Sequence, residues 1–167
     1  MTKPLNPIGK FRPIQREQLF PEKIHDAYMH RRKPPEPTVC PDCKAVFHEG
    51  RWQWGSVAAK AHEELCPACH RIRENFPAGY VTLGGPFFAA NREEILHLAR
   101  NQEAREKAEH PLERIMKIED TPEGVMITTT GIHLARDIGD AAKHAYQGEL
   151  EFHYNDDENL LRVQWKR

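Results

Sequence analysis

The C-terminal third of the chain carries the clearest alternation of hydrophobic and polar positions. Residues 112–120 and 124–130 are rich in β-branched and apolar side chains and are separated by the turn sequence "TPEG", which predicts a β-hairpin. Residues 131–147 then place small and apolar side chains at helical spacing. A hairpin followed by an amphipathic helix is therefore expected here.

A second hairpin is predicted at the end of the chain. The segments "GELEFHY" and "LLRVQW" both alternate with period two and are joined by the polar stretch "NDDEN". One apolar face is expected to meet the other across the strands: Leu150, Phe152 and Tyr154 against Leu161, Val163 and Trp165. Residues 111–167 are thus predicted to form a two-layer ββαββ unit, with four strands and one helix on the buried face.

The helical pattern is also strong in residues 91–109. Glu93 and Glu94 suit the positive end of a helix dipole, and Ile95, Leu98 and Ala99 recur at helical spacing. The second half of the segment is polar on all sides, which is typical of a solvated helix. We therefore expect residues 91–110 to be a connecting helix.

The N-terminal half divides into two further regions. Residues 1–37 hold seven prolines with basic residues between them, which predicts an extended arm with a short helix near "PEKIHDAYMHRR". Residues 38–90 contain all four cysteines. Together with the helix and the ββαββ unit, this predicts an α+β chain in which residues 38–90 form a small metal-held unit of the zinc-ribbon or treble-clef type.

Charge and hydropathy limit the class of protein. The formal net charge of −1 conceals a gradient, because residues 1–80 carry 13 Lys/Arg against 9 Asp/Glu and residues 81–167 carry 11 against 16. Mean hydropathy is −0.74, and no apolar run approaches the roughly 20 residues that a membrane helix needs. The N-terminus has no hydrophobic core of a secretory signal. A cytoplasmic protein without membrane contact is expected.

The cysteines are arranged as two matched pairs. Cys40, Cys43, Cys66 and Cys69 give the pattern C-x2-C-x22-C-x2-C. Two such turns supply the four thiolates of a tetrahedral zinc site. The segment "KAVFHEGRWQW" between the pairs suits a hairpin, and "HRIRENF" after the second pair suits the start of a helix. The pattern predicts one structural Zn²⁺ whose binding energy is part of the folding energy.

Other uses of the cysteines fit less well. A thioredoxin-like redox site needs one C-x-x-C beside a βαβ pattern. Catalytic zinc keeps an open coordination position, whereas four thiolates close the site even with His48, His62 and His70 nearby. Iron also accepts four sulfurs, so it remains a second choice of metal. No nucleophile–base pair, P-loop or dinucleotide loop is present, so neither an enzyme nor a small-molecule substrate is expected.

The segments "CPDC", "CPACHRIRENFPAGYV" and "ITTTGIHLARDIGDAAKHAYQGELEFHY" resemble a group of small proteobacterial proteins. That group is related to the NMD-type adaptor family of archaea and eukaryotes, which exports the large ribosomal subunit. The resemblance implies binding to the ribosome, through its large subunit, and a role in stress or low-oxygen conditions. The adaptor's further cysteine pairs and export signals have no counterpart here, so only ribosome binding carries over.

Three groups of side chains are candidates for contact with RNA. Arginine and lysine bind phosphate, and tryptophan stacks on unpaired bases. A helix N-terminus after "TTT", capped by Thr129 or Thr130, is a further candidate phosphate site. The candidates are Lys10, Arg12, Arg16, Arg31, Arg32 and Lys33 in the arm, Lys44, Arg51, Trp52, Arg71 and Arg73 around the cysteines, and His133 and Arg136 in the "HLAR" helix.

Two functions follow from these features. The first is a zinc-binding protein of the ribosome or its rRNA that acts sterically in translation control or ribosome hibernation under stress. The second is a zinc-stabilised protein–protein adaptor in a stress or low-oxygen response. The acidic balance of residues 81–167 argues against RNA contact along the whole chain and keeps the second function open.

Overall fold

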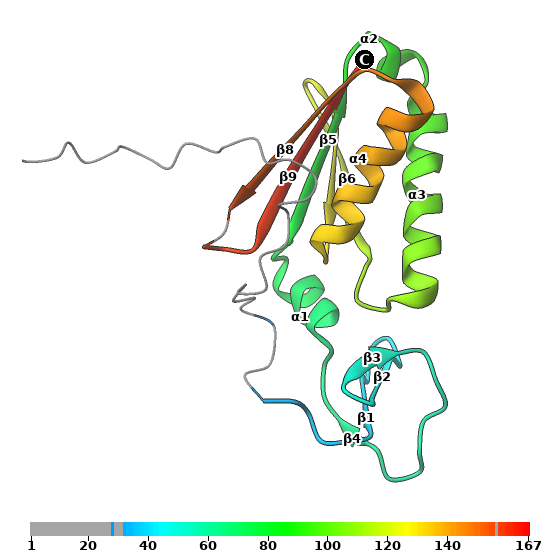
Figure 1. Cartoon of the computed structure of the whole chain (residues 1–167), viewed down its shortest axis with the longest axis vertical. Coiled ribbons are helices and arrows are strands. Elements are labelled where there is room, and N and C mark those ends of the chain that lie inside the picture. The colour runs from blue at the N-terminus through cyan, green and yellow to red at the C-terminus, as the bar shows by residue number, and fades with distance from the viewer. Residues whose placement is uncertain (1–27, 29–31, 156) are drawn as a thin grey trace, which may run out of the picture.

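The structure is a computed structural model that describes residue 28 and residues 32–167 except residue 156. It is a mixed α+β fold with two small sheets, as the sequence predicts. We call residues 38–76 the knuckle unit and residues 78–167 the sheet unit (Figure 1). None of the helices within the described ranges is long and apolar enough to cross a membrane.

The knuckle unit is built from very short strands around the cysteines. It contains β1 (Thr38–Val39), β2 (Val46–His48), β3 (Arg51–Gln53), β4 (His62–Glu63) and the helix α1 (Pro67–Glu74). The predicted hairpin is confirmed as β2–β3, and its turn places Glu49 and Gly50 at φ of 51° and 76°. The strands run in the order β3-β2-β1-β4. This sheet fixes the first cysteine pair, and α1 begins directly after Cys66.

The sheet unit holds five strands and three helices. These are β5 (Gly79–Gly84), α2 (Pro86–Ala90), α3 (Arg92–Glu109), β6 (Ile115–Thr121), β7 (Gly124–Thr129), α4 (Ile132–Tyr146), β8 (Glu149–Asn155) and β9 (Leu160–Lys166). The strand order is β6-β7-β5-β9-β8. The predicted hairpins are confirmed as β6–β7 and β8–β9. In the latter, Leu150, Phe152 and Tyr154 lie opposite Trp165, Val163 and Leu161, as the alternation indicates.

The predicted boundary at residue 90 is wrong, because β5 belongs to the sheet and not to the cysteine unit. It pairs antiparallel with β7 and parallel with β9, so it is the central strand. Val81 and Leu83 on this strand are fully buried. The sheet therefore has five strands rather than four, and the cysteine unit ends near residue 76.

The helices cover one face of the sheet and form the core with it. Figure 1 shows α4 packed against the sheet with α3 beside it. Gly139 allows this close approach, since a Cβ at this position would lie 2.5 Å from Val163 Cγ1. Ile95, Leu96 and Ala99 of α3 are buried in the same core. The first half of α3 is thus a packing element and not only a connector, while its second half is largely exposed.

Candidate metal centre and adjoining cleft

The four cysteines converge on one point in the knuckle unit. Their Sγ atoms all lie within 4.8 Å of one another, and Cys43 Sγ lies 3.7 Å from Cys66 Sγ. A tetrahedron of sulfurs about 2.3 Å from zinc has edges of about 3.8 Å. Three of the four cysteines are buried and none is in a disulfide. The donor set and its spacing fit a closed structural zinc site.

Backbone geometry explains how each pair forms its edge of the tetrahedron. In the first turn, Lys44 takes a positive φ of 66°, and Cys40 N donates to Ala45 O at 2.8 Å. In the second, Cys66 is the N-cap of α1, and its sulfur accepts from Cys69 N at 3.4 Å. Pro67 occupies the first turn of that helix, where its missing N–H costs nothing.

The sulfurs strongly perturb one another. A hydrogen bond with Cys66 lowers the pKa of the Cys43 thiol, whereas that same contact, followed by burial, raises the pKa of Cys66. Burial also raises the pKa of Cys69, opposed by the guanidinium of Arg114. Four thiolates this close repel one another strongly, and a divalent cation is the usual means of holding all four ionised.

An ion pair joins the two knuckle turns. Arg73 on α1 donates to both carboxylate oxygens of Asp42, at 2.8 and 2.6 Å. The guanidinium lowers the pKa of this carboxyl group. Asp42 lies between Cys40 and Cys43, so the pair links the second knuckle to the first. Arg73, an RNA candidate by sequence, thus has a partner within its own unit.

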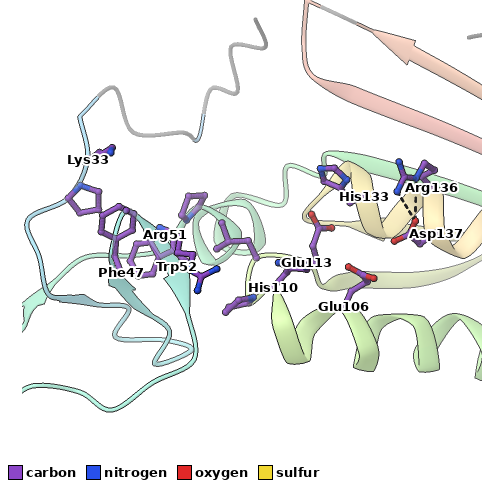
Figure 2. Close-up of a pocket in the computed structure, with 15 residues that line it drawn as sticks. Lys33, Phe47, Arg51, Trp52, Glu106, His110, Glu113, His133, Arg136 and Asp137 are labelled. Atoms are coloured by element: carbon purple, nitrogen blue, oxygen red, sulfur yellow. Dashed lines mark hydrogen bonds and ion pairs between the residues drawn. The ribbon is translucent and has the colours of Figure 1, made fainter. Parts of the chain in front are cut away.

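A cleft of about 710 Å³ lies between the knuckle unit and the sheet unit (Figure 2). On one side, which we call the knuckle wall, lie Arg51 and Trp52 of β3 together with Lys33 of the segment before β1. The opposite wall carries His133 and Arg136 from α4. These five RNA candidates come from three separate segments of the chain. The rest of the lining comprises Pro34, Phe47, Gly50, Pro67, Glu106, His110, Pro111, Leu112, Glu113 and Asp137.

Other RNA candidates lie elsewhere. Arg71 is 2% exposed, donates to Phe76 O at 3.1 Å and stacks on the Tyr28 ring, so burial removes it from the RNA-contacting surface. Arg32 and Lys44 are exposed but do not line the cleft. Lys10, Arg12, Arg16 and Arg31, with most of the predicted arm, lie outside the described residues.

The amino end of α4 is closed by an acid that the sequence did not reveal. The carboxylate of Glu113 accepts from Leu134 N at 3.0 Å, and a Cβ on Gly131 would lie 2.2 Å from it. Neither threonine caps the helix, because Thr129 donates to Gly131 O and Thr130 to Leu112 O. The predicted phosphate site at this helix end is therefore wrong. Glu113 already fills it.

The remaining charged groups of α4 are partly paired. Arg136 donates to Asp137 Oδ1 at 3.1 Å. Loss of hydration, followed by the charge of Arg136, lowers the pKa of His133. Both side chains point toward the cleft in Figure 2, on the wall opposite Arg51. Their contribution to a ligand site therefore comes from lining the cleft and not from the helix terminus.

Glu113 should make folding stability depend on pH. Burial raises its pKa from 4.5 to about 7. Between these values the unfolded chain has lost the proton and the folded chain keeps it, so the free energy of unfolding falls as pH rises. The slope is about 1.4 kcal/mol per pH unit, or ~3 kcal/mol across the window.

Glu113→Gln should remove this pH-dependent loss of folding stability. The amide oxygen of glutamine can still accept from Leu134 N–H, but the side chain cannot ionise. Urea unfolding at pH 5 and pH 8, with zinc in excess, should show a drop in stability about 2 kcal/mol smaller than in the wild type. Glu109→Gln, at an exposed position on α3, is the matched control. If the free energy of unfolding falls equally between pH 5 and pH 8 in Glu113→Gln and in the wild type, the buried carboxyl group is not the cause of the pH dependence.

No family model matches this chain, and no curated protein is similar to it in sequence. The four-cysteine cluster is consequently the feature that defines the molecule. Its four sulfurs lie close enough together to hold a metal ion, and zinc is the metal that such a donor set suits best.

Proposed function

We propose that the protein is a zinc-stabilised RNA-binding protein that associates with the ribosome and acts sterically in translation control or hibernation. The observation that carries the proposal is the cleft. Lys33, Arg51, Trp52, His133 and Arg136, chosen as RNA candidates from separate stretches of sequence, line one concavity. The resemblance to adaptors of the large ribosomal subunit supports rRNA as the source of the ligand.

The chemistry of the knuckle wall suits a single-stranded segment. Lys33 and Arg51 are exposed, and no described residue forms an ion pair with either. Trp52 is half-buried beside the cysteines and packs edge-on against Phe47, with ring centroids 5.6 Å apart. Base stacking on an aromatic ring is worth about 1–3 kcal/mol per base. A phosphate at Arg51 and an unstacked base at Trp52 would use both groups.

The rest of the lining limits how such a ligand would lie. Pro34, Pro67, Pro111 and Leu112 give the lining an apolar part, which suits a base better than a phosphate. Glu106 and Asp137 are acidic and lie on the sheet-unit side. The phosphate backbone is therefore proposed to follow the knuckle wall, with the bases directed into the cleft.

Charge reversal at Arg51 should weaken RNA binding. We expect Arg51→Glu to reduce ribosome or rRNA affinity by roughly 5- to 150-fold, or about 1–3 kcal/mol, because a contact is lost and a repulsion gained. The melting temperature should hardly change, since exposed substitutions usually alter stability by about 0.5 kcal/mol or less. The measurement is co-sedimentation of the full chain with purified ribosomes over a series of salt concentrations.

Arg100→Glu is the matched control, because Arg100 is exposed on α3 and does not line the cleft. It should sediment like the wild type. Equal loss in both variants would point to non-specific electrostatic attraction. Sedimentation of Arg51→Glu at wild-type affinity would remove the cleft from the RNA surface.

A second function, that of a protein–protein adaptor, is favoured by a different observation. Four large apolar side chains are exposed in the knuckle unit: Trp54, Val57, Ile72 and Phe76. Ile72 and Phe76 lie at the end of α1, and exposed apolar side chains in proximity are typical of protein interfaces. If neither wild type nor variants sediment with ribosomes, this function becomes the better explanation of the fold.

A further inference from the structure

One side chain of the sheet unit reaches into the metal centre. Arg114, at the start of the β6 hairpin, is 8% exposed. Its Nη2 donates to Cys66 Sγ at 3.3 Å and to Cys69 Sγ at 3.4 Å, and its Nη1 lies 3.5 Å from Cys69 Sγ. The guanidinium therefore bridges both ligands of the second knuckle from a position 45 or more residues away in sequence.

The charges at this contact depend on the metal. A Zn²⁺ ion with four thiolates carries a net charge of −2, and a neighbouring guanidinium offsets part of it. Burying an arginine is unfavourable unless charged or polar partners surround it. Arg114 has Pro111 O at 2.9 Å from its Nε, and its other donors face the sulfurs. Its buried position is thus best compensated when the cysteines are metal ligands.

The same short segment builds the wall of the cleft. Leu112 packs against the cysteine cluster, and Glu113 closes the amino end of α4 through Leu134 N. Thr130 fixes the segment, since it donates to Leu112 O at 2.6 Å and accepts from Arg114 N at 2.9 Å. Residues 111–113 line the cleft itself. Movement of Arg114 away from the sulfurs would therefore disturb the cleft directly.

We propose that Arg114 couples metal binding to the docking of the two units, so that the cleft is complete only in the metal-bound protein. The bridge to Cys66 and Cys69 holds residues 111–114 against the knuckle. Loss of the metal, or of the guanidinium, frees that segment and the adjoining end of α4. The idea that this Arg114 contact controls RNA binding rests on the proposed function. The coupling of metal binding to the docking of the two units does not.

The test measures metal affinity and backbone protection in the full chain, and RNA is not used. Arg114→Met should weaken Zn²⁺ affinity, measured by competition with a chelating dye, by about 10- to 100-fold, as loss of an outer-shell partner does. In the zinc-saturated variant, amide hydrogen exchange should rise about tenfold or more in residues 112–114 and 132–137. Chelation of zinc from the wild type should produce the same rise. Exchange in β8 and β9 should not change.

Two further variants separate coupling from general loss of stability. Arg114→Lys keeps the charge but cannot bridge two sulfurs and Pro111 O together, so its zinc affinity should be intermediate. Arg71→Met removes another buried guanidinium, one that bonds Phe76 O and stacks on Tyr28. It should leave zinc affinity and exchange in residues 111–137 unchanged.

The proposal is overturned if chelation raises exchange in the knuckle unit alone, since the units are then independent. It is also overturned if Arg114→Met binds zinc with wild-type affinity. Should that variant fail to fold, chelation of the wild type and the lysine variant still decide the question. Failure of ribosome co-sedimentation would contradict the proposed function but would not change the coupling result. The proposed function and the Arg114 coupling are therefore tested independently.

Discussion

Cys66→Ser should abolish stoichiometric metal binding and unfold the knuckle unit while the sheet unit stays folded. Cys66 is fully buried, lies 3.7 Å from Cys43 Sγ, caps α1 and accepts from Arg114. A serine hydroxyl stays protonated and is a poor zinc ligand. Structural zinc contributes about 10–16 kcal/mol in small zinc-held units, which exceeds or matches the whole stability of a typical domain.

The knuckle unit has little else to hold it. Its strands are two or three residues long. The buried cluster at the sulfurs comprises Cys40, Cys66, Ala68 and Cys69, with Cys43, Trp52, Leu65 and Leu112 packed against it. The sheet unit has its own core, so its protection from exchange should persist apart from the segment next to Arg114. Metal analysis of purified protein and amide exchange of each unit measure the two effects.

His70→Ala is the control, because His70 follows Cys69 directly but is not part of the sulfur cluster. It should keep one metal ion per chain. A Cys66→Ser protein that still holds one equivalent of zinc would show that another residue completes the site. Wild-type protein without metal, or with a disulfide inside either pair when freshly reduced, would contradict the assignment altogether.

Features that depend on short stretches of chain could be predicted from the sequence. The spacing of two C-x2-C turns defines a four-sulfur cluster before any coordinates, because each turn fixes its own pair. The β8–β9 hairpin is similarly local. Alternation with period two sets which side chains face the helix, and a short connection brings Leu150 opposite Trp165.

Features that depend on distant partners could not be predicted in the same way. The segment "GYVTLG" is short and flanked by glycine, and its proximity in sequence to the cysteines suggested membership of the knuckle unit. Its pairing with β9 is parallel and joins residues about 80 apart, such as Val81 and Val163. Nothing in a local pattern specifies that register. The β-branched residues of this segment were the signal that could have identified a buried strand.

The site shows the same division. The sequence predicts capping of the "HLAR" helix by the nearest threonines, but the acid that closes α4 is Glu113, some twenty residues upstream. The sequence pattern indicates Arg71 as an RNA candidate and does not single out Arg114. In the structure Arg71 stacks on Tyr28, and Arg114 donates to Cys66 Sγ. The convergence of Lys33, Arg51 and Arg136 on one cleft depends on how the two units dock. Sequence supplied the residue types, and tertiary contacts decided their roles.

A truncation tests whether the sheet unit begins at residue 78 or at residue 111. We expect the shorter fragment to lose its fold completely. A fragment of residues 111–167, the predicted ββαββ unit, should not fold. It lacks β5, so β7 and β9 each lose the strand between them, and the six residue pairs of β5 with each neighbour are absent. The fragment also loses Val81, Leu83, Ile95 and Leu96 from its core.

The energies favour complete loss of structure over a weakened fold. Burial of a Val, Leu or Ile side chain contributes about 1.5–3 kcal/mol, so four such residues contribute roughly 6–12 kcal/mol. That equals the total stability of a typical small domain, about 5–15 kcal/mol. Residues 78–167 retain β5, α2 and α3 and should fold cooperatively. The hydrogen bond from Ala78 N to Thr129 O at 2.9 Å, which extends the β5–β7 pairing, is also kept.

Far-UV circular dichroism and urea unfolding of the two fragments provide the comparison. Residues 78–167 should give a single cooperative transition, and residues 111–167 none. The Val81→Ala and Leu83→Ala changes within the longer fragment should each cost about 1–5 kcal/mol, because both side chains are fully buried in the central strand. A cooperative transition in residues 111–167 would mean that its two hairpins can close a sheet around α4 without β5. The original boundary at residue 110 would then describe a genuine folding unit.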